Sequence, residues 1–217
     1  MISSTIKRLQ DRRDSAEEIG EDAGFTLIEL MVVLLILAIL LAIAIPTFLG
    51  VTKSANDRAA QSNLNTALVN AKSIFQNNSQ SYALAGATGT ASVTANAASL
   101  QASLSSAEPN LSFVTGSVTN GGTGNPAVGV AVASDGNGVI LVEQAKGTGN
   151  CWYIIDNAVA ESATAGTPYA NFTGTGTTGS AAALAAGTWY GKVPGPNTSC
   201  STTPPSTMTV QASGFGS

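Results

Sequence analysis

Glu29 is the residue whose chemistry most needs an explanation. It is the single charged residue between Asp22 and Lys53, and it lies within a run of apolar side chains. A carboxylate in an apolar medium costs several kcal/mol unless it is paired or protonated. Glu29 follows Phe25 by one helical turn, so an ammonium group at Phe25 would be a natural partner. The chain has such a group only if it is cut between Gly24 and Phe25; otherwise Glu29 lies in the headgroup layer without a specific role.

The composition excludes most enzyme chemistries. The 217 residues contain no histidine, two cysteines and 10% charged residues, with a formal net charge of −4. Without histidine the chain has no Ser-His-Asp or Cys-His mechanism and lacks a principal zinc ligand. The exported part offers no clustered titratable groups, so we expect no enzyme. Because few basic residues follow Lys72, we expect no nucleic-acid partner.

The element that must position Glu29 is an apolar helix. Residues 1–24 are polar and heavily charged, whereas residues 25–45 are almost purely apolar. A helix over this apolar run would be about 31 Å long, enough to cross a bilayer. Basic residues before the run predict a cytoplasmic N-terminus and an exported remainder. The A-I-A triplet at 42–44 offers an alternative, an ordinary secretory cleavage that releases a soluble protein beginning at Ile45.

The helical pattern continues past the apolar run. Apolar side chains recur at i, i+4, i+7 and i+11 in Leu64, Leu68, Ala71 and Phe75. This stripe makes residues 46–78 an amphipathic continuation of the helix. Pro46, with Gly50 four residues on, predicts a kink or local melting, because proline removes a backbone hydrogen bond and clashes with the preceding turn. The alternative is two helices separated by a break at Pro46.

Residues 79–217, the predicted exported domain, are rich in Ala, Gly, Ser and Thr. Residues 79–109 show weak periodicity and are predicted to be a long connection. Five strands follow, separated by Gly-rich turns: Leu111–Val118, Ala127–Ala133, Val139–Gln144, Cys151–Asp156 and Thr188–Val193. Consecutive strands on short turns predict an antiparallel sheet whose apolar face packs on the helical stripe. The predicted fold class is therefore α+β, with one long, partly transmembrane N-terminal helix on a small sheet.

Two further features of the exported domain bear on its chemistry. Cys151 and Cys200 form an even pair, which in an exported domain suggests a disulfide; the alternative is two free thiols. A bridge that closes about 50 residues would contribute roughly 4 kcal/mol. The segment 135–138, which begins with Asp135, is similar to part of a calcium loop but lacks the distal glutamate, so we interpret it as a turn. We therefore expect no metal and no cofactor, with calcium near Asp135 as the alternative.

The sequence GFTLIEL at residues 24–30 resembles the N-terminal processing and methylation motif of type IV prepilins and pseudopilins. A charged segment precedes it and an apolar run follows it, as in that family. The resemblance implies that residues 1–24 are a leader, cut between Gly24 and Phe25 by a prepilin peptidase, and that the Phe25 amine is then methylated. It also implies that Glu29 neutralises the Phe25 amine of a neighbouring subunit during filament assembly.

The same resemblance implies a pilin fold and a structural role. The chain would be a subunit of a type IV pilus, stored in the lipid bilayer and polymerised through its N-terminal helix into an extracellular filament. An assembly platform and its ATPase would move it, and Pro46 would correspond to the family's helix kink. Two alternatives share this N-terminus: a pseudopilin of a type II secretion or DNA-uptake system, and a membrane-anchored surface binding protein that never polymerises. In the last case Glu29 would be incidental.

Overall fold

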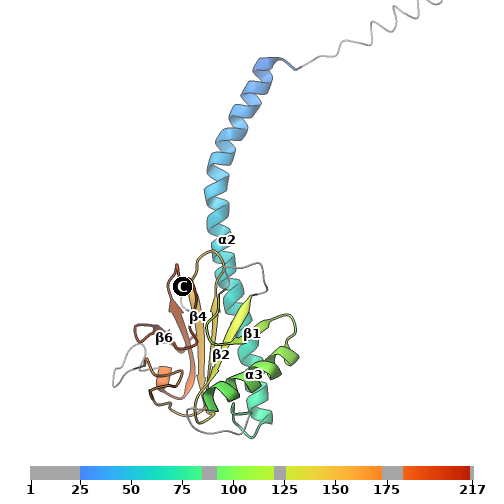
Figure 1. Ribbon diagram of the computed structural model, residues 1–217. Helices are drawn as coiled ribbons and strands as arrows, with labels where there is room; N and C mark the ends of the chain where they lie inside the picture. Colours follow the sequence, from blue (N-terminus) through green and yellow to red (C-terminus); the bar gives the residue numbers. More distant parts are fainter. Residues whose placement is uncertain (1–24, 85–91, 120–125, 173–182, 216–217) are drawn as a thin grey trace, which may run out of the picture. The chain divides into compact units, whose positions relative to one another are not determined.

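The computed structural model describes residues 25–84, 92–119, 126–172 and 183–215 (Figure 1). The order of elements is α2 (Leu27–Asn77), α3 (Ser92–Ala107), β1 (Ser112–Thr115), β2 (Ala127–Val132), β3 (Gly138–Gln144), β4 (Cys151–Asn157), β5 (Gly187–Val193) and β6 (Thr209–Gln211). The chain divides into two compact units, residues 1–49 and residues 50–217. The predicted leader, residues 1–24 with Gly24 at its end, lies outside the described residues.

Helix α2 is one continuous helix of 51 residues with Pro46 inside it. The alternative of two helices that break at Pro46 is therefore wrong. A long run of Leu, Ile and Ala favours the helix before the proline, and the proline itself removes a single backbone donor. Residues 27–49 of α2 belong to the first unit, and residues 50–77 belong to the second.

The sheet of the second unit has six strands in the order β1-β2-β3-β4-β5-β6. Strands β2 to β5 are antiparallel neighbours, as predicted, and β6 is antiparallel to β5, but β1 pairs with β2 in parallel. The prediction of a purely antiparallel sheet is wrong at this edge, because a parallel pair needs a long connection rather than a tight turn. Val118 lies in that connection, three residues after the end of β1. It forms two backbone hydrogen bonds of 2.8 Å with Cys200, as donor in one and acceptor in the other.

The strands differ from the predicted ones mainly at their ends. Strands β2, β3, β4 and β5 lie within one residue of the predicted bounds at each end, whereas β1 is four residues long rather than the predicted eight. Strand β6, at Thr209–Gln211, was not predicted. It lies in the Ser/Thr-rich tail and holds to the sheet through three residue pairs with β5, so its own sequence carries little strand signal.

Helix α3 corrects the prediction that residues 79–109 are one long connection. Ala97, Leu100 and Leu104 are buried at helical spacing, so α3 does have an apolar stripe. Two leucines among alanine and serine give a weak periodic signal, but alanine has the highest helix propensity. The serines satisfy their hydroxyls within the helix, as Ser103 Oγ does by donating to the Ser99 carbonyl at 3.1 Å.

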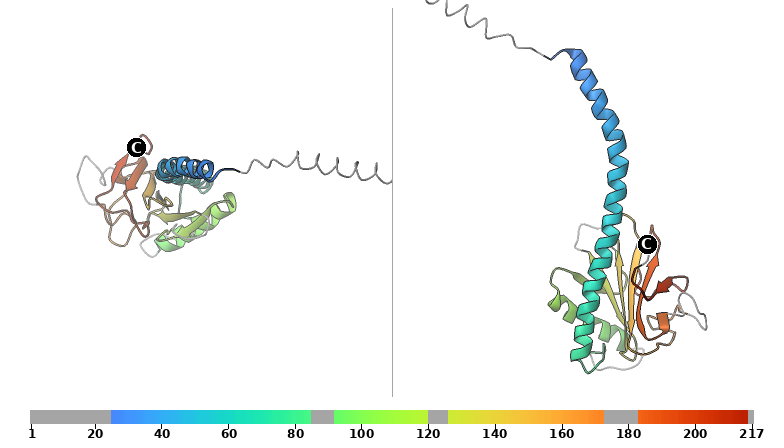
Figure 2. Two further views of the ribbon diagram at one scale, coloured as in Figure 1. Left: turned by 90° about the horizontal axis from the view of Figure 1, so that it is seen from above. Right: turned by 180° about the vertical axis from the view of Figure 1, so that it is seen from behind.

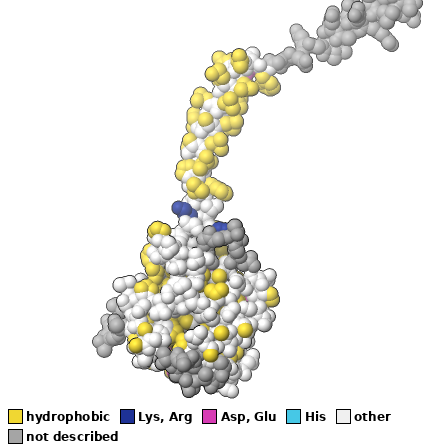
Figure 3. All heavy atoms as spheres, viewed as in Figure 1, with side chains coloured by type: hydrophobic (Ala, Val, Ile, Leu, Met, Phe, Trp, Pro, Cys, Tyr) yellow, Lys and Arg dark blue, Asp and Glu magenta, His cyan; other side chains and the backbone are white. Residues whose placement is uncertain are grey.

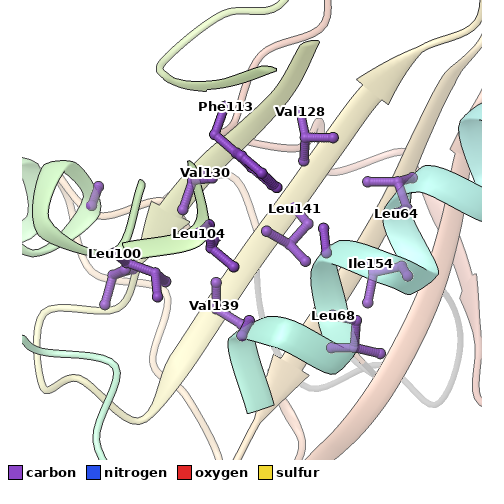
Figure 4. Close-up of a cluster of buried hydrophobic side chains, with 14 of the residues drawn as sticks. Leu64, Leu68, Leu100, Leu104, Phe113, Val128, Val130, Val139, Leu141 and Ile154 are labelled. Atoms are coloured by element: carbon purple, nitrogen blue, oxygen red, sulfur yellow. The ribbon is translucent and has the colours of Figure 1, made fainter. Parts of the chain in front are cut away.

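Both helices of the second unit cover the same face of the sheet (Figure 2). Figure 4 shows the side chains that meet there: Leu64 and Leu68 from α2, Leu100 and Leu104 from α3, and Val130, Val139, Leu141 and Ile154 from β2, β3 and β4. The predicted stripe is confirmed, with Leu64, Leu68 and Ala71 buried and Phe75 half-buried against the same core.

Irregular segments cover the opposite face of the sheet. Ile140, Val142 and Ile155 alternate with the helix-facing residues of their strands, as the pleat requires, and are fully buried. Tyr169, Phe172 and Met208 from the connecting loops pack on them in a second apolar cluster that also contains both cysteines. The sheet is thus the middle of three layers, between two helices and a set of loops.

Candidate functional site

The start of α2 holds Glu29 through a reciprocal cap. Thr26 donates to Glu29 Oε2 from its backbone N–H at 2.9 Å and from its hydroxyl at 2.8 Å, and the Glu29 N–H donates to Thr26 Oγ1 at 3.3 Å. This is a capping box, in which Thr-x-x-Glu satisfies backbone donors that the first helical turn leaves free. The Thr-x-x-Glu spacing at residues 26–29 already indicates this cap, which was not predicted.

The cap leaves Glu29 able to act on another molecule. Both hydrogen bonds from Thr26 end on Oε2, so Oε1 can accept a donor without breaking the cap. The carboxylate is exposed, and Phe25, Ile28 and Val32 border a shallow apolar hollow around it. A carboxylate on an apolar surface favours a cationic partner that is buried together with it. The geometry therefore suits the pairing with an amine that the sequence suggested.

The rest of the first unit is an apolar helix with exposed side chains. Figure 3 shows hydrophobic side chains over residues 25–49, and large apolar side chains there are about half exposed or more. Among the described residues, α2 is the helix long and apolar enough to cross a membrane. An apolar surface of this extent does not stay in water, so lipid or other protein must cover it.

Pro46 and Gly50 lie inside the helix without interrupting it. Proline cannot donate to the carbonyl one turn earlier, and the next residue, Thr47, donates its hydroxyl to the Ile43 carbonyl at 2.9 Å. Gly50 has open space where a Cβ atom would be. Pro46 thus removes one backbone hydrogen bond of the helix, and Gly50 leaves a gap in its side-chain surface. The kink itself stays a prediction.

Cys151 and Cys200 form the predicted disulfide and are 49 positions apart in sequence. Cys151 begins β4, and Cys200 makes the bridge to Val118 beside β1. Because both cysteines belong to the loop-covered face, the bond fastens the Gly- and Thr-rich C-terminal loops to the centre of the sheet. The alternative of two free thiols is wrong.

Asp57 is a second anchor, which the sequence analysis missed. Its Oδ1 accepts hydrogen bonds from the Thr148 hydroxyl at 2.8 Å, from Asn150 Nδ2 at 3.0 Å and from Trp152 Nε1 at 3.0 Å. Two donors come from the β3–β4 turn and the third from the start of β4, all more than 90 residues away in sequence. One helical carboxylate thus fastens the hairpin to α2. No local pattern indicates such a contact.

Asp156 forms a similar contact near the other end of α2. Lys72 Nζ lies 3.0 Å from Asp156 Oδ1 in an ion pair, and Tyr82 donates its hydroxyl to Asp156 Oδ2 at 2.8 Å. Burial and the charge of Asp156 raise the pKa of Tyr82 far above its ordinary value, so this tyrosine stays a donor. These contacts hold the end of the helix against β4.

Glu143 is a second buried carboxyl on the helix-facing side of the sheet, besides Asp156. It follows Val139 and Leu141 on the same face of β3, and only 2% of its surface is exposed. Asn63 donates to its Oε1 at 3.1 Å, while Oε2 has no hydrogen-bond partner among the described residues. Burial raises the pKa of Glu143 to about 8, although the hydrogen bond from Asn63 acts in the opposite direction.

Asp135 lies in a turn, as the sequence analysis preferred. Its carboxylate accepts from the Asn137 N–H at 3.0 Å and from Asn137 Nδ2 at 2.7 Å, and Gly136 adopts a positive φ of 79°. Burial and the neighbouring Asp135 carboxylate raise the pKa of Glu161 to about 7. Within the described residues no group of three or more His, Cys, Asp or Glu side chains is arranged to hold a metal ion.

Comparison with known proteins gives matches for the N-terminal segment of the chain. Residues 21–45 match the model of the prokaryotic N-terminal methylation motif. The chain is also similar to the type IV wide pilus major component PilA4 of Thermus thermophilus, with 46% identity over 59 residues. That match covers 27% of this chain and 44% of the relative, so the chain spans less than half of the relative's length. No solved structure matches the chain.

Proposed function

Because the N-terminal segment of this chain is that of the type IV pilin family, we propose that the chain is a structural subunit of a type IV pilus. The observation that carries the proposal is the combination of the methylation motif at residues 21–45 with an apolar helix whose side chains are exposed along residues 25–49. A helix of this kind needs a bilayer at one stage and other protein at another, and a pilin uses both in turn.

The proposed mechanism begins in the membrane. A prepilin peptidase removes residues 1–24, and methylation of the new amine at Phe25 follows. The subunit waits with its apolar helix in the bilayer and its sheet unit on the exported side. An assembly platform driven by an ATPase then lifts it outward. The apolar side chains exchange lipid for those of neighbouring helices, so burial of apolar surface is kept at both stages.

Glu29 sets the register of the incoming subunit in this mechanism. Its Oε1 accepts from the Phe25 amine of a neighbour while Oε2 keeps the cap with Thr26. A subunit placed elsewhere along the helix would leave a charge unpaired in an apolar environment, which costs several kcal/mol. The pair therefore favours one axial position over its neighbours.

The test compares intact masses and N-terminal sequences of the protein from membranes and from sheared surface filaments. We expect a chain that begins at methylated Phe25 in both fractions. A start at Met1 would indicate an ordinary anchor, and a start at Ile45 a secreted soluble domain. Either of these would overturn the proposal.

Glu29→Gln separates the two roles of the carboxyl. Glutamine can still cap the helix but carries no charge. We expect processed Glu29→Gln subunits to accumulate in the membrane, with about a hundredfold or greater loss from the sheared fraction, as for breaking a buried charge pair. Thr26→Ala is the matched control, because it removes the capping hydroxyl and keeps the charge, and we expect it to retain filaments. Unchanged filaments in Glu29→Gln would leave Glu29 as a cap only and sink the assembly role.

A further inference from the structure

The sheet unit has two ends that differ in charge. Strand β3 runs from one to the other, a rise of about 20 Å over its residues. At the first end, the chain that follows α2 meets the turn before β3, where the Tyr82 N–H donates to the Gly136 carbonyl at 2.7 Å. At the second end, the turn after β3 lies beside α2, and a Cβ at Gly147 would be 3.8 Å from Lys53 Cγ.

The second end is basic. Four of its side chains carry positive charge: Lys53, Arg58, Lys146 and Lys192. The first three are exposed, and Lys192 lies in register with Trp152 of β4, 4.8 Å above its ring. The basic side chains visible in Figure 3 gather at this end.

The acidic groups at this end, Asp57, Glu108 and Glu143, offset only part of that charge, because four basic side chains outnumber them. Asp57 is a hydrogen-bond acceptor for Thr148 and Asn150 of the β3–β4 turn and for Trp152 of β4. Glu143 is buried beneath α2 with a raised pKa that favours its neutral form. The surface that another molecule meets is therefore that of the exposed lysines and arginine.

The first end is acidic. Asp135 is exposed in the turn before β3, and Glu161 lies beside it, close enough that the charge of Asp135 helps to raise the pKa of Glu161. The basic residue at this end, Lys72, is already paired with Asp156. Because the pKa of Glu161 is about 7, the two carboxyls share part of a proton near neutral pH, and a cation that approaches from outside favours the form in which both are charged.

We propose that the basic end, at Lys53 and Lys146, docks on the acidic end, at Asp135 and Glu161, of a second copy of this chain. The inference rests on the proposed pilus function and deepens it by naming a contact between exported units. Charge complementarity selects the partner, because one chain carries both surfaces at opposite ends. The helix rises about 36 Å from Lys53 to Asn77, so the ends are too far apart to meet within one unit. Copies arranged head to tail bring each basic end to an acidic one.

Lys146→Glu tests the contact by reversing charge at the basic end. We expect normal processing at Phe25 and about a tenfold loss of subunits from the sheared filament fraction, since like charges now face each other. The matched control is Ala98→Glu with Ala102→Glu on the exposed face of α3, which changes the net charge by the same two units away from both ends. We expect filaments of this control at the wild-type level.

Two further measurements keep the inference falsifiable. Asp135→Lys in the Lys146→Glu background should restore filaments by exchanging the two signs. If the turn does not tolerate lysine, the salt dependence of the filament level provides the test. Added salt should weaken wild-type filaments by screening attraction and strengthen Lys146→Glu filaments by screening repulsion. Equal filament levels in Lys146→Glu and the α3 control would overturn the contact while leaving the pilus function intact, provided that subunits still begin at methylated Phe25. Salt-dependent binding of wild type to anionic vesicles, lost in Lys146→Glu without a change in filaments, would assign the basic end to lipid and also overturn it.

Discussion

The two halves of helix α2 have opposite relations to the rest of the chain. From Leu27 to Leu49 the helix is apolar and every residue is exposed. From Gly50 to Asn77 the same helix carries polar side chains outward and buries one stripe that includes Leu64 and Leu68. The second half has its partner in the sheet of its own chain, whereas the first half has none within the described part of the first unit.

This difference separates stability from assembly. Residues that bury the second half determine whether the sheet unit folds, because their contacts are intramolecular. Residues of the first half contribute little to that folding, and their apolar surface is free to be covered by lipid or by other helices. A substitution should therefore act on unfolding or on assembly according to the half in which it lies.

Removing the disulfide should give the largest difference between an effect on unfolding and an effect on assembly. Cys151→Ser with Cys200→Ser releases a loop of 49 residues, and the chain-entropy model gives a loss of about 4 kcal/mol in the free energy of unfolding of the sheet unit. Urea unfolding of the detergent-solubilised full chain, followed by near-ultraviolet circular dichroism of Trp152 and Trp189, measures this loss.

Membrane anchoring of the double cysteine variant is the control for the disulfide prediction. Processing at Phe25 and extraction from membranes should not change, because both belong to the first unit. A loss of less than about 1 kcal/mol would mean that the loops on that face hold without the bridge. Release of the variant from the membrane would contradict the independence of the two halves.

A matched pair of leucine substitutions gives the next largest difference. Leu64 is fully buried in the core between α2 and the sheet, whereas Leu40 is exposed in the first half. We expect Leu64→Ala to lower the free energy of unfolding by about 3 kcal/mol, as for other buried leucines, and Leu40→Ala to leave it unchanged. The same urea titration measures both. Equal effects would show that the first half also supports the sheet unit.

The sequence predicted the elements with strong periodicity. The apolar run, the stripe at Leu64, Leu68 and Ala71, and strands β2 to β5 each repeat a pattern over several residues. Helix α3 escaped prediction because alanine and serine dilute a stripe that has two leucines. The parallel pairing of β1 depends on where a connection returns, which the local sequence does not encode.

Prediction of the candidate site had the same limit. Glu29 was identified because one charge in an apolar run is conspicuous, and the cysteines because there are two. The contacts of Asp57 join residues more than 90 positions apart and left no local signal. Glu143 did leave one: alternation along β3 places it on the face of Val139 and Leu141, which predicts its burial.

Glu143→Gln gives the smallest expected effect and extends the contrast to two glutamates, one in each unit. The folded-state pKa of Glu143, about 8, lies above that of an exposed glutamate, so the folded state binds the proton more tightly. The stability from this proton is full below about pH 4 and is lost as the pH rises through 8. Between pH 7 and 9 wild type should lose about 1 kcal/mol, and Glu143→Gln, which cannot ionise, should not.

Two other glutamates serve as controls for this pH dependence. Glu29→Gln should unfold with the wild-type pH dependence, because Glu29 lies outside the sheet unit. Glu161→Gln should remove a loss of unfolding free energy centred at a lower pH, since the pKa of Glu161 is about 7. If the free energy of unfolding changes equally with pH in wild type and Glu143→Gln between pH 7 and 9, the pKa of Glu143 is not raised in the folded state. Glu143 would then resemble the exposed Glu29, and the two units would differ in apolar packing but not in the protonation of their glutamates.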